Sequence, residues 1–149
     1  TVNELEALAA GLFQMEAAIF CPSGTMTNQI AIKCHTQPGD EVICEKMSHV
    51  YIYEGGGIAF NSGCQVKTVD GDRGRITAAS VIEAINPDDI HKARTSLVSL
   101  ENTANRGGGS CYDFEEIEKI KGCSTSHIAK TLGYKLYDEV IHQDNMVIL

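Results

Sequence analysis

The sequence contains no tryptophan, no cluster of basic residues and no long apolar run. A membrane-spanning helix needs about 20 consecutive apolar residues, whereas apolar stretches such as residues 17–21 are far shorter. Lys and Arg total 12 against 20 Asp and Glu, which gives a formal net charge of -8. Because this acidic balance disfavours binding to polyanions, we expect neither a nucleic-acid partner nor a membrane partner.

Cysteine and histidine patterns do not indicate a metal or a disulfide framework. The six cysteines are scattered without a Cys-x-x-Cys pair, and the five histidines share no ligand spacing. Glu4, Glu6 and Glu16 precede the first lysine, which is unlike the basic start of a secretory signal. We therefore expect reduced thiols, no metal and a cytoplasmic location.

The 149 residues suit one domain of ordinary globular composition. The first residue is Thr1 rather than Met, so we expect a sequence that begins inside a longer chain. Thr1 followed by Glu4 predicts a capped helix, and residues 47–53 are interpreted as either a loop or a short helix. Helical and extended patterns alternate, with strands predicted at 17–21, 41–45, 65–69 and 96–100 and helices predicted after residues 25, 77 and 113. This alternation indicates an α/β domain with a largely parallel sheet.

The segment Ser23-Gly24-Thr25 lies between a predicted strand and a predicted helix. Gly24 lets the backbone approach a ligand, and the free N–H groups at a helix start attract a phosphate. Alternatively, Ser23 or Thr25 only caps the helix. The sequence has neither a Walker A motif nor a GxGxxG motif.

Polar residues also follow the later predicted strands. His49 comes after the second strand, and Glu101 and Asn102 come after the fourth. Since open α/β sheets bind ligands at the carboxyl ends of their strands, these groups are expected at the same edge as Ser23. The His49 ring could stack on a planar ligand, with a purely structural role as the alternative. Glu54 is interpreted as a solvated surface residue.

Several of these segments together resemble one family. Residues 1–6, 17–20 with 23–28, 49 with 54–57, and 99–103 resemble, in this order, the low-specificity L-threonine aldolases. That family belongs to the β-eliminating lyases among the pyridoxal-phosphate enzymes. The resemblance implies an aspartate-aminotransferase-like (fold type I) large domain with a mostly parallel sheet.

The resemblance also implies roles for individual residues. Ser23, Gly24 and Thr25 would hold the phosphate of pyridoxal phosphate, His49 would stack on its ring, and Glu101 and Asn102 would lie at the rim of the active site. The implied reaction cleaves L-threonine or L-allo-threonine to glycine and acetaldehyde. The implied assembly is a homo-oligomer, either a dimer or a tetramer.

The sequence departs from the family after about Lys121. It contains neither His-x-Asp-Gly-Ala-Arg nor the Ser-Lys-Gly setting of the Schiff-base lysine, and Ala104 stands where members often carry histidine. We therefore assign no catalytic residue and expect little turnover from these residues alone. Residues 1–121 are interpreted as the front part of the large domain, with part of that domain missing. Residues 122–149 are interpreted as a linker and a piece of the small domain.

Two alternatives remain open from the sequence. One is a non-catalytic fragment or subunit of such an enzyme, which the missing lysine motif favours. The other is a different fold-type-I lyase or aminotransferase, because a phosphate-binding loop and a stacking histidine serve several such reactions.

Overall fold

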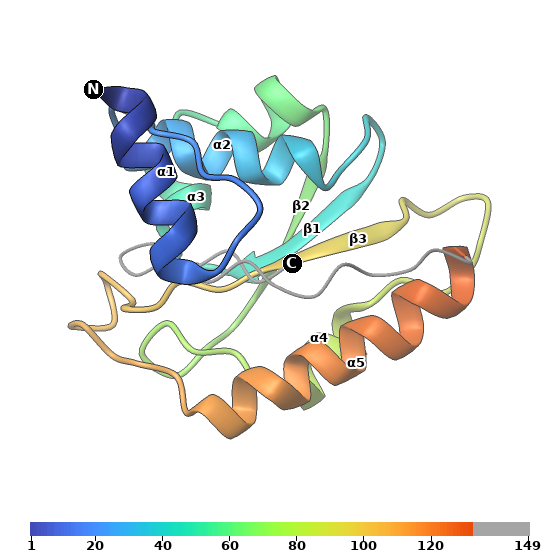
Figure 1. Ribbon diagram of the computed structural model, residues 1–149. Helices are drawn as coiled ribbons and strands as arrows, with labels where there is room; N and C mark the ends of the chain where they lie inside the picture. Colours follow the sequence, from blue (N-terminus) through green and yellow to red (C-terminus); the bar gives the residue numbers. More distant parts are fainter. Residues whose placement is uncertain (133–149) are drawn as a thin grey trace.

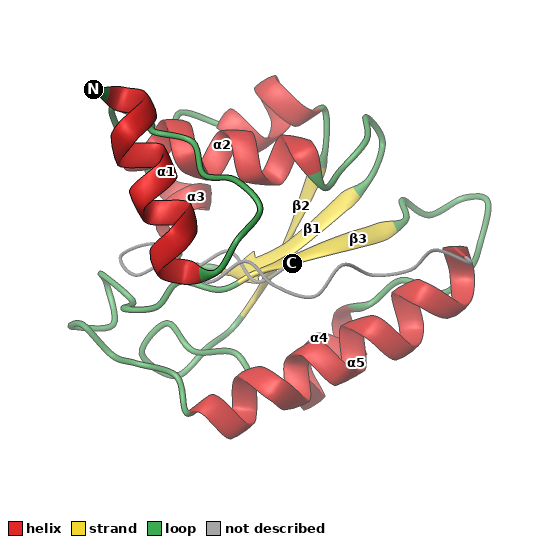
Figure 2. Ribbon diagram, viewed as in Figure 1, coloured by secondary structure: helices red, strands yellow, loops and turns green. Residues whose placement is uncertain are grey.

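The computed structural model describes residues 1–132 and forms a three-layer α/β arrangement. Its elements are α1 (Val2–Phe13), α2 (Gly24–Cys34), β1 (Glu41–Glu45), α3 (His49–Ile52), the π-helical turn η1 (Ile58–Ser62), β2 (Gln65–Val69), α4 (Ala78–Ala84), β3 (Thr95–Ser99) and α5 (Phe114–Leu132). The strands form a parallel sheet in the order β2-β1-β3. Helices α1, α2 and α3 lie on one side of this sheet, and α4 and α5 lie on the other (Figures 1 and 2). The predicted α/β class with a parallel sheet is therefore confirmed.

Strand β1 is buried along its whole length because helices cover both faces of the sheet. Successive side chains of a strand point to opposite faces. Val42 and Cys44 accordingly pack with Ile32 of α2, whereas Ile43 packs with Val81 of α4 in a second apolar cluster. The central strand thus joins the two halves of the core.

Most predicted elements are present at or near their predicted residues. Strands β1 and β2 span the predicted residues, and β3 begins one residue before the predicted start. Helix α1 has the predicted capping box between Thr1 and Glu4, and Thr77 caps α4 as expected. The ambiguous segment 47–53 contains the four-residue helix α3.

The predicted strand at residues 17–21 is wrong. No strand forms there, and Ile19 and Phe20 are 67% and 48% exposed. The segment is a loop whose Phe20 N–H donates to Oε1 of Glu6 on α1 at 2.8 Å. An apolar run becomes a strand only where a neighbouring strand pairs with it, and none of the described strands does so.

Helix α2 does not bury the face that Thr27, Ile30, Ala31 and Cys34 share at helical spacing. Its buried residues are Asn28, Gln29 and Ile32. The polar pair is buried because both side chains bind one carboxylate, described below.

Residues 122–126, interpreted from the sequence as part of a linker, are helical, since α5 continues through them to Leu132. The division of the chain after residue 121 stays a prediction. The predicted helix at residues 128–137 is present as the end of α5 up to Leu132, and its remainder and the predicted strand at 146–149 lie outside the described residues. Within residues 1–132, no helix combines the length and the apolar character that crossing a bilayer requires.

Candidate active site

The loops that follow β1 and β3 meet at the carboxyl edge of the sheet. β1 and β3 are parallel neighbours, so His49 after β1 and Glu101 after β3 emerge at the same edge. The Glu101 carboxylate accepts hydrogen bonds from the backbone N–H of His49 at 2.9 Å and from that of Asn105 at 3.0 Å. Glu101 therefore fixes the start of α3 against the loop after β3.

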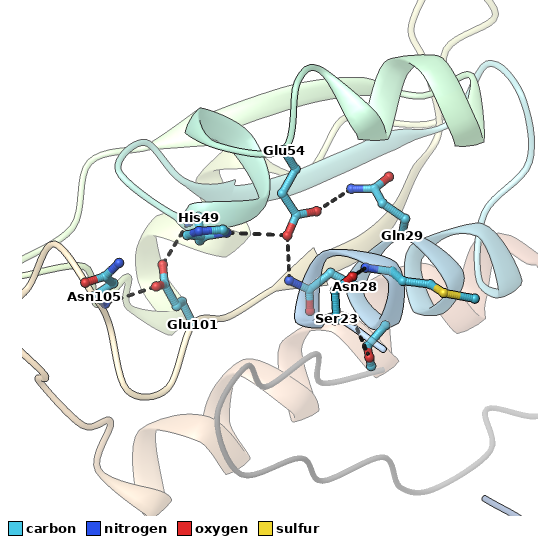
Figure 3. A network of polar contacts seen from close by, with 9 residues as sticks. Ser23, Asn28, Gln29, His49, Glu54, Glu101 and Asn105 are labelled. Carbon is cyan, nitrogen blue, oxygen red and sulfur yellow. Dashed lines mark hydrogen bonds and ion pairs between the residues drawn. The ribbon is translucent and has the colours of Figure 1, made fainter. Parts of the chain in front are cut away.

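A buried carboxylate connects His49 to helix α2. The Glu54 side chain is 0% exposed, and its Oε1 lies 3.4 Å from Nδ1 of His49. Asn28 Nδ2 donates to Oε1 at 2.7 Å, and Gln29 Nε2 donates to Oε2 at 2.5 Å (Figure 3). The interpretation of Glu54 as a solvated surface residue is therefore wrong, and Asn28 and Gln29 are site residues that the sequence did not indicate.

The glycines after Glu54 explain how its side chain reaches α2. Gly55 and Gly56 have φ values of 62° and 72°, which is the left-handed region that favours glycine. A Cβ on Gly57 would lie 2.6 Å from the amide group of Gln29. The triple glycine thus turns the chain sharply and lets the backbone lie against the side chain that binds Glu54. A carboxylate directly before three glycines was the sequence signal for this cluster.

The start of helix α2 offers backbone donors. Ser23 Oγ accepts a hydrogen bond from the Met26 N–H at 3.2 Å, so Ser23 caps the helix. Among the described residues, the N–H groups of Gly24 and Thr25 have no hydrogen-bond partner. The phosphate-binding role of Ser23, Gly24 and Thr25 stays a prediction, which these two donors suit.

An open groove of about 600 Å³ runs beside α2 and η1. Its lining comprises Ser23, Thr25, Met26, Gln29, Ile30, Lys33, Cys34 and Asn61. His49 does not line this groove. The link between the start of α2 and His49 is instead the hydrogen bond from Asn28 to Glu54.

The His49 ring is partly accessible. Its side chain is 34% exposed, and the ring lies 5.4 Å from that of Tyr53 at an interplanar angle of 39°. The Arg106 guanidinium lies over the Tyr53 ring, 5.0 Å from its centroid. The His49 ring, the Tyr53 ring and the Arg106 guanidinium therefore lie next to one another in space. Such a setting suits His49 to contact a planar ligand.

Hydrogen bonds hold the loop after β3 in place, within the loop and against Arg73. Asn102 Oδ1 accepts a hydrogen bond from the Tyr112 N–H at 3.0 Å, so Asn102 holds this loop against Tyr112. The position of Asn102 at the rim of an active site stays a prediction. Arg73 Nε donates to the Gly107 carbonyl at 3.1 Å, and Ser110 Oγ donates to the Arg73 carbonyl at 2.5 Å. A Cβ on Gly107 would lie 1.9 Å from that same carbonyl oxygen. The glycine run at 107–109 is therefore a packed turn, and not the flexible one that its composition suggests.

The β-eliminating lyase family model matches residues 1–136, most of this chain, and the chain therefore belongs to that family. It is 44% identical over 106 residues to the low-specificity L-threonine aldolase of Escherichia coli K12, covering 70% of this chain and 32% of the relative. It is 37% identical over 141 residues to low-specificity L-threonine aldolase 1 of Arabidopsis thaliana, covering 92% and 38%.

The structure is similar to that of the Leishmania major threonine aldolase, with a TM-score of 0.65 and 28% identity. That match covers 71% of this chain and 30% of the other. The predicted fold type is thus confirmed. The chain spans about a third of the length of the curated relatives that it matches.

Proposed function

We propose that this chain provides part of the cofactor-binding site of a pyridoxal-phosphate-dependent threonine aldolase. The reaction is the cleavage of L-threonine or L-allo-threonine to glycine and acetaldehyde. The observation that carries the proposal is the joint position of His49, Glu54 and helix α2 at the carboxyl edge of the sheet, in a chain whose relatives are named for this activity. A cytoplasmic homo-oligomer, dimer or tetramer, is part of the same proposal.

The chain's own groups fit the two ends of the cofactor. The N–H groups of Gly24 and Thr25, which have no hydrogen-bond partner within residues 1–132, suit the phosphate because helix starts attract anions. The ring of His49 is partly exposed and is held at its edge through Nδ1, which suits it to lie against the pyridine ring.

When bound, pyridoxal phosphate supplies an electron sink for the electron pair released as the Cα–Cβ bond breaks. The described residues hold and orient the reactants. Glu101 keeps the loop with His49 in place through the His49 N–H. Tyr53 lies beside the His49 ring and Arg106 lies over the Tyr53 ring, so both groups stand close to a ligand that contacts His49.

Non-covalent binding of pyridoxine 5′-phosphate tests the cofactor site, because this compound lacks the aldehyde that reacts with surface lysines. We expect the ³¹P resonance to shift on titration of the chain, and we expect Gly24→Val to abolish that shift. Gly11→Val is the control, since a Cβ at this glycine in α1 meets nothing within 4 Å. Equal binding by the original chain and Gly24→Val would contradict the assignment of the phosphate loop.

A chimera tests the reaction. The segment of the E. coli aldolase that matches this chain would be replaced by the corresponding residues of this chain. We expect the chimera to release acetaldehyde from L-threonine and L-allo-threonine, and we expect His49→Ala to reduce that release. A chimera that binds the cofactor but only transaminates or β-eliminates would favour another fold-type-I enzyme.

The lack of the Schiff-base lysine motif favours a second candidate, a non-catalytic fragment or subunit. The 149-residue chain alone would then leave threonine uncleaved while still associating with a complete relative, which sizing of the mixture measures. Borohydride reduction with pyridoxal phosphate should give no specific adduct. A single adduct at Lys121 would contradict this candidate.

A further inference from the structure

We propose that Glu54 is a positioning residue, a buried carboxylate that sets the orientation and tautomer of His49 and ties it to helix α2. This inference rests on the proposed function, because it assigns Glu54 to the cofactor site through His49. Glu54 itself is 0% exposed in its side chain, so its effect on a ligand passes through the residues that it binds.

The surroundings of Glu54 are unusual for a carboxylate. Burying a charge is costly unless hydrogen bonds compensate for the lost water. Within the described part of the chain, no Lys or Arg forms an ion pair with Glu54, and its compensation comes from Asn28, Gln29 and His49. An apolar side chain at such a position would fold with less cost. The carboxylate is therefore better explained by what it holds than by stability.

His49 is held at two points. Its backbone N–H donates to Glu101 at 2.9 Å, and its Nδ1 faces Glu54 at 3.4 Å. The hydrogen bond made by one ring nitrogen determines which nitrogen of a neutral histidine carries the proton. In the neutral form of His49, Nδ1–H would therefore face the carboxylate, and Nε2 would carry no proton. Among the described residues, none makes a hydrogen bond with Nε2.

The same carboxylate fixes the distance between His49 and α2. Asn28 and Gln29 lie one turn into the helix that begins at Gly24. Their amide groups occupy both oxygens of Glu54, at 2.7 and 2.5 Å. Gly57 allows this approach, because a Cβ there would lie 2.6 Å from the Gln29 amide. Glu54 thus connects the proposed phosphate-binding element to the proposed stacking ring.

The test compares Glu54→Gln with Glu41→Gln in the full 149-residue chain. Glu41 is a matched control because it is also a buried glutamate that accepts hydrogen bonds from three side chains, those of Gln65, Asn86 and Thr95. It is the first residue of β1 and makes no contact with His49. Glutamine at position 54 has one oxygen for three donors, so the contact with His49 weakens. Thermal unfolding monitored by circular dichroism establishes that each variant is folded.

The first measurement is the tautomer of His49, read from two-bond ¹H–¹⁵N spectra at pH 8. We expect Nδ1–H in the original chain and in Glu41→Gln, and a mixture of tautomers in Glu54→Gln. Protonation mainly at Nε2 in the original chain would overturn the proposal, and that result needs no variant to fold. An unchanged tautomer in folded Glu54→Gln would overturn it as well.

The second measurement is the affinity for pyridoxine 5′-phosphate by ³¹P titration. We expect Glu54→Gln to weaken binding about tenfold or more, as loss of a hydrogen bond to a charged group does, and Glu41→Gln to leave it within about twofold. Equal affinities of the two variants would overturn the role of Glu54 in the site. If the original chain does not bind at all, the proposed function fails, while the tautomer measurement still decides whether Glu54 positions His49.

Discussion

The two ends of strand β1 both bury carboxylates, but they use them differently. At the amino end, Asp40 pairs with Arg94 through contacts of 3.0 and 2.7 Å, and Glu41 accepts from three side chains. At the carboxyl end, Glu101 accepts from two backbone N–H groups and Glu54 faces His49. The amino end joins elements through side-chain pairs, whereas the carboxyl end orients loops around a ring that remains partly exposed.

The largest difference is expected in thiol reactivity. Burial raises the pKa of Cys44 on β1 to about 11, whereas Cys34 and Cys111 are exposed. Since the thiolate is the reactive form, Cys44 should be alkylated about 100-fold more slowly than an exposed cysteine at pH 8. Mass spectrometry of iodoacetamide-treated chain over time measures this. If Cys44 reacts as fast as Cys34, water reaches β1 near its carboxyl end. That result would contradict the description of the two ends of β1 given above.

The ion pair at the amino end should matter for folding. Arg94→Ala leaves the Asp40 carboxylate, which is 8% exposed, without its cation, so we expect the free energy of unfolding to fall by about 1–3 kcal/mol in urea titrations. Lys46→Ala is the control near the carboxyl end. Lys46 pairs with Asp70, but these side chains are 54% and 81% exposed, so its loss should cost less than about 1 kcal/mol.

Acid should remove the effect of Arg94→Ala. Burial raises the pKa of Asp40, but hydrogen bonds from Arg94 and the Gln37 N–H lower it more, so the net pKa lies below the ordinary value of 3.8. A lowered pKa contributes stability above the unfolded-state value, and this is lost as the pH falls through the folded-state value. The two chains should therefore converge in stability below the pKa of Asp40. A constant gap down to that pH would contradict the ion pair as its cause.

The smallest expected effect compares two helix caps. Ser23 caps α2 and Thr77 caps α4, each accepting a backbone N–H at 3.2 Å. Ser23→Ala and Thr77→Ala should each lower the free energy of unfolding by about 1 kcal/mol. Only Ser23→Ala should also weaken binding of pyridoxine 5′-phosphate, measured by ³¹P titration. Equal weakening by both would assign the effect to general stability and not to the start of α2.

Local sequence signals predicted much of the sheet and most of the helices. Turn residues before Glu41 and the alternation of polar and apolar residues in 65–69 predict strands, and the structure has strands at those positions. These signals are local, and neighbouring residues alone can carry them. The run at 17–21 failed because a strand also needs a partner, which its own residues do not reveal.

The candidate site was predictable only in part. His49 and Glu101 were predicted at one edge because parallel strands bring their carboxyl ends together, and the bond between them agrees. Glu54, Asn28 and Gln29 were missed because polar residues are usually exposed. Their burial depends on contacts between residues more than 20 positions apart in the sequence, from Asn28 and Gln29 to Glu54, which no local pattern encodes.

The packed turn after β3 limits how this edge can change over time. Gly107 lies so close to the Arg73 carbonyl that no larger residue fits, and Arg73 and Ser110 bind across the same contact. An insertion in the loop after β2, which carries Arg73, would therefore displace the loop after β3, which carries Gly107, and the reverse also holds. We therefore expect the two loops to change together in evolution, with their backbones inherited as one unit. New specificity is expected to arise at exposed positions such as Arg106, which can change without moving either backbone.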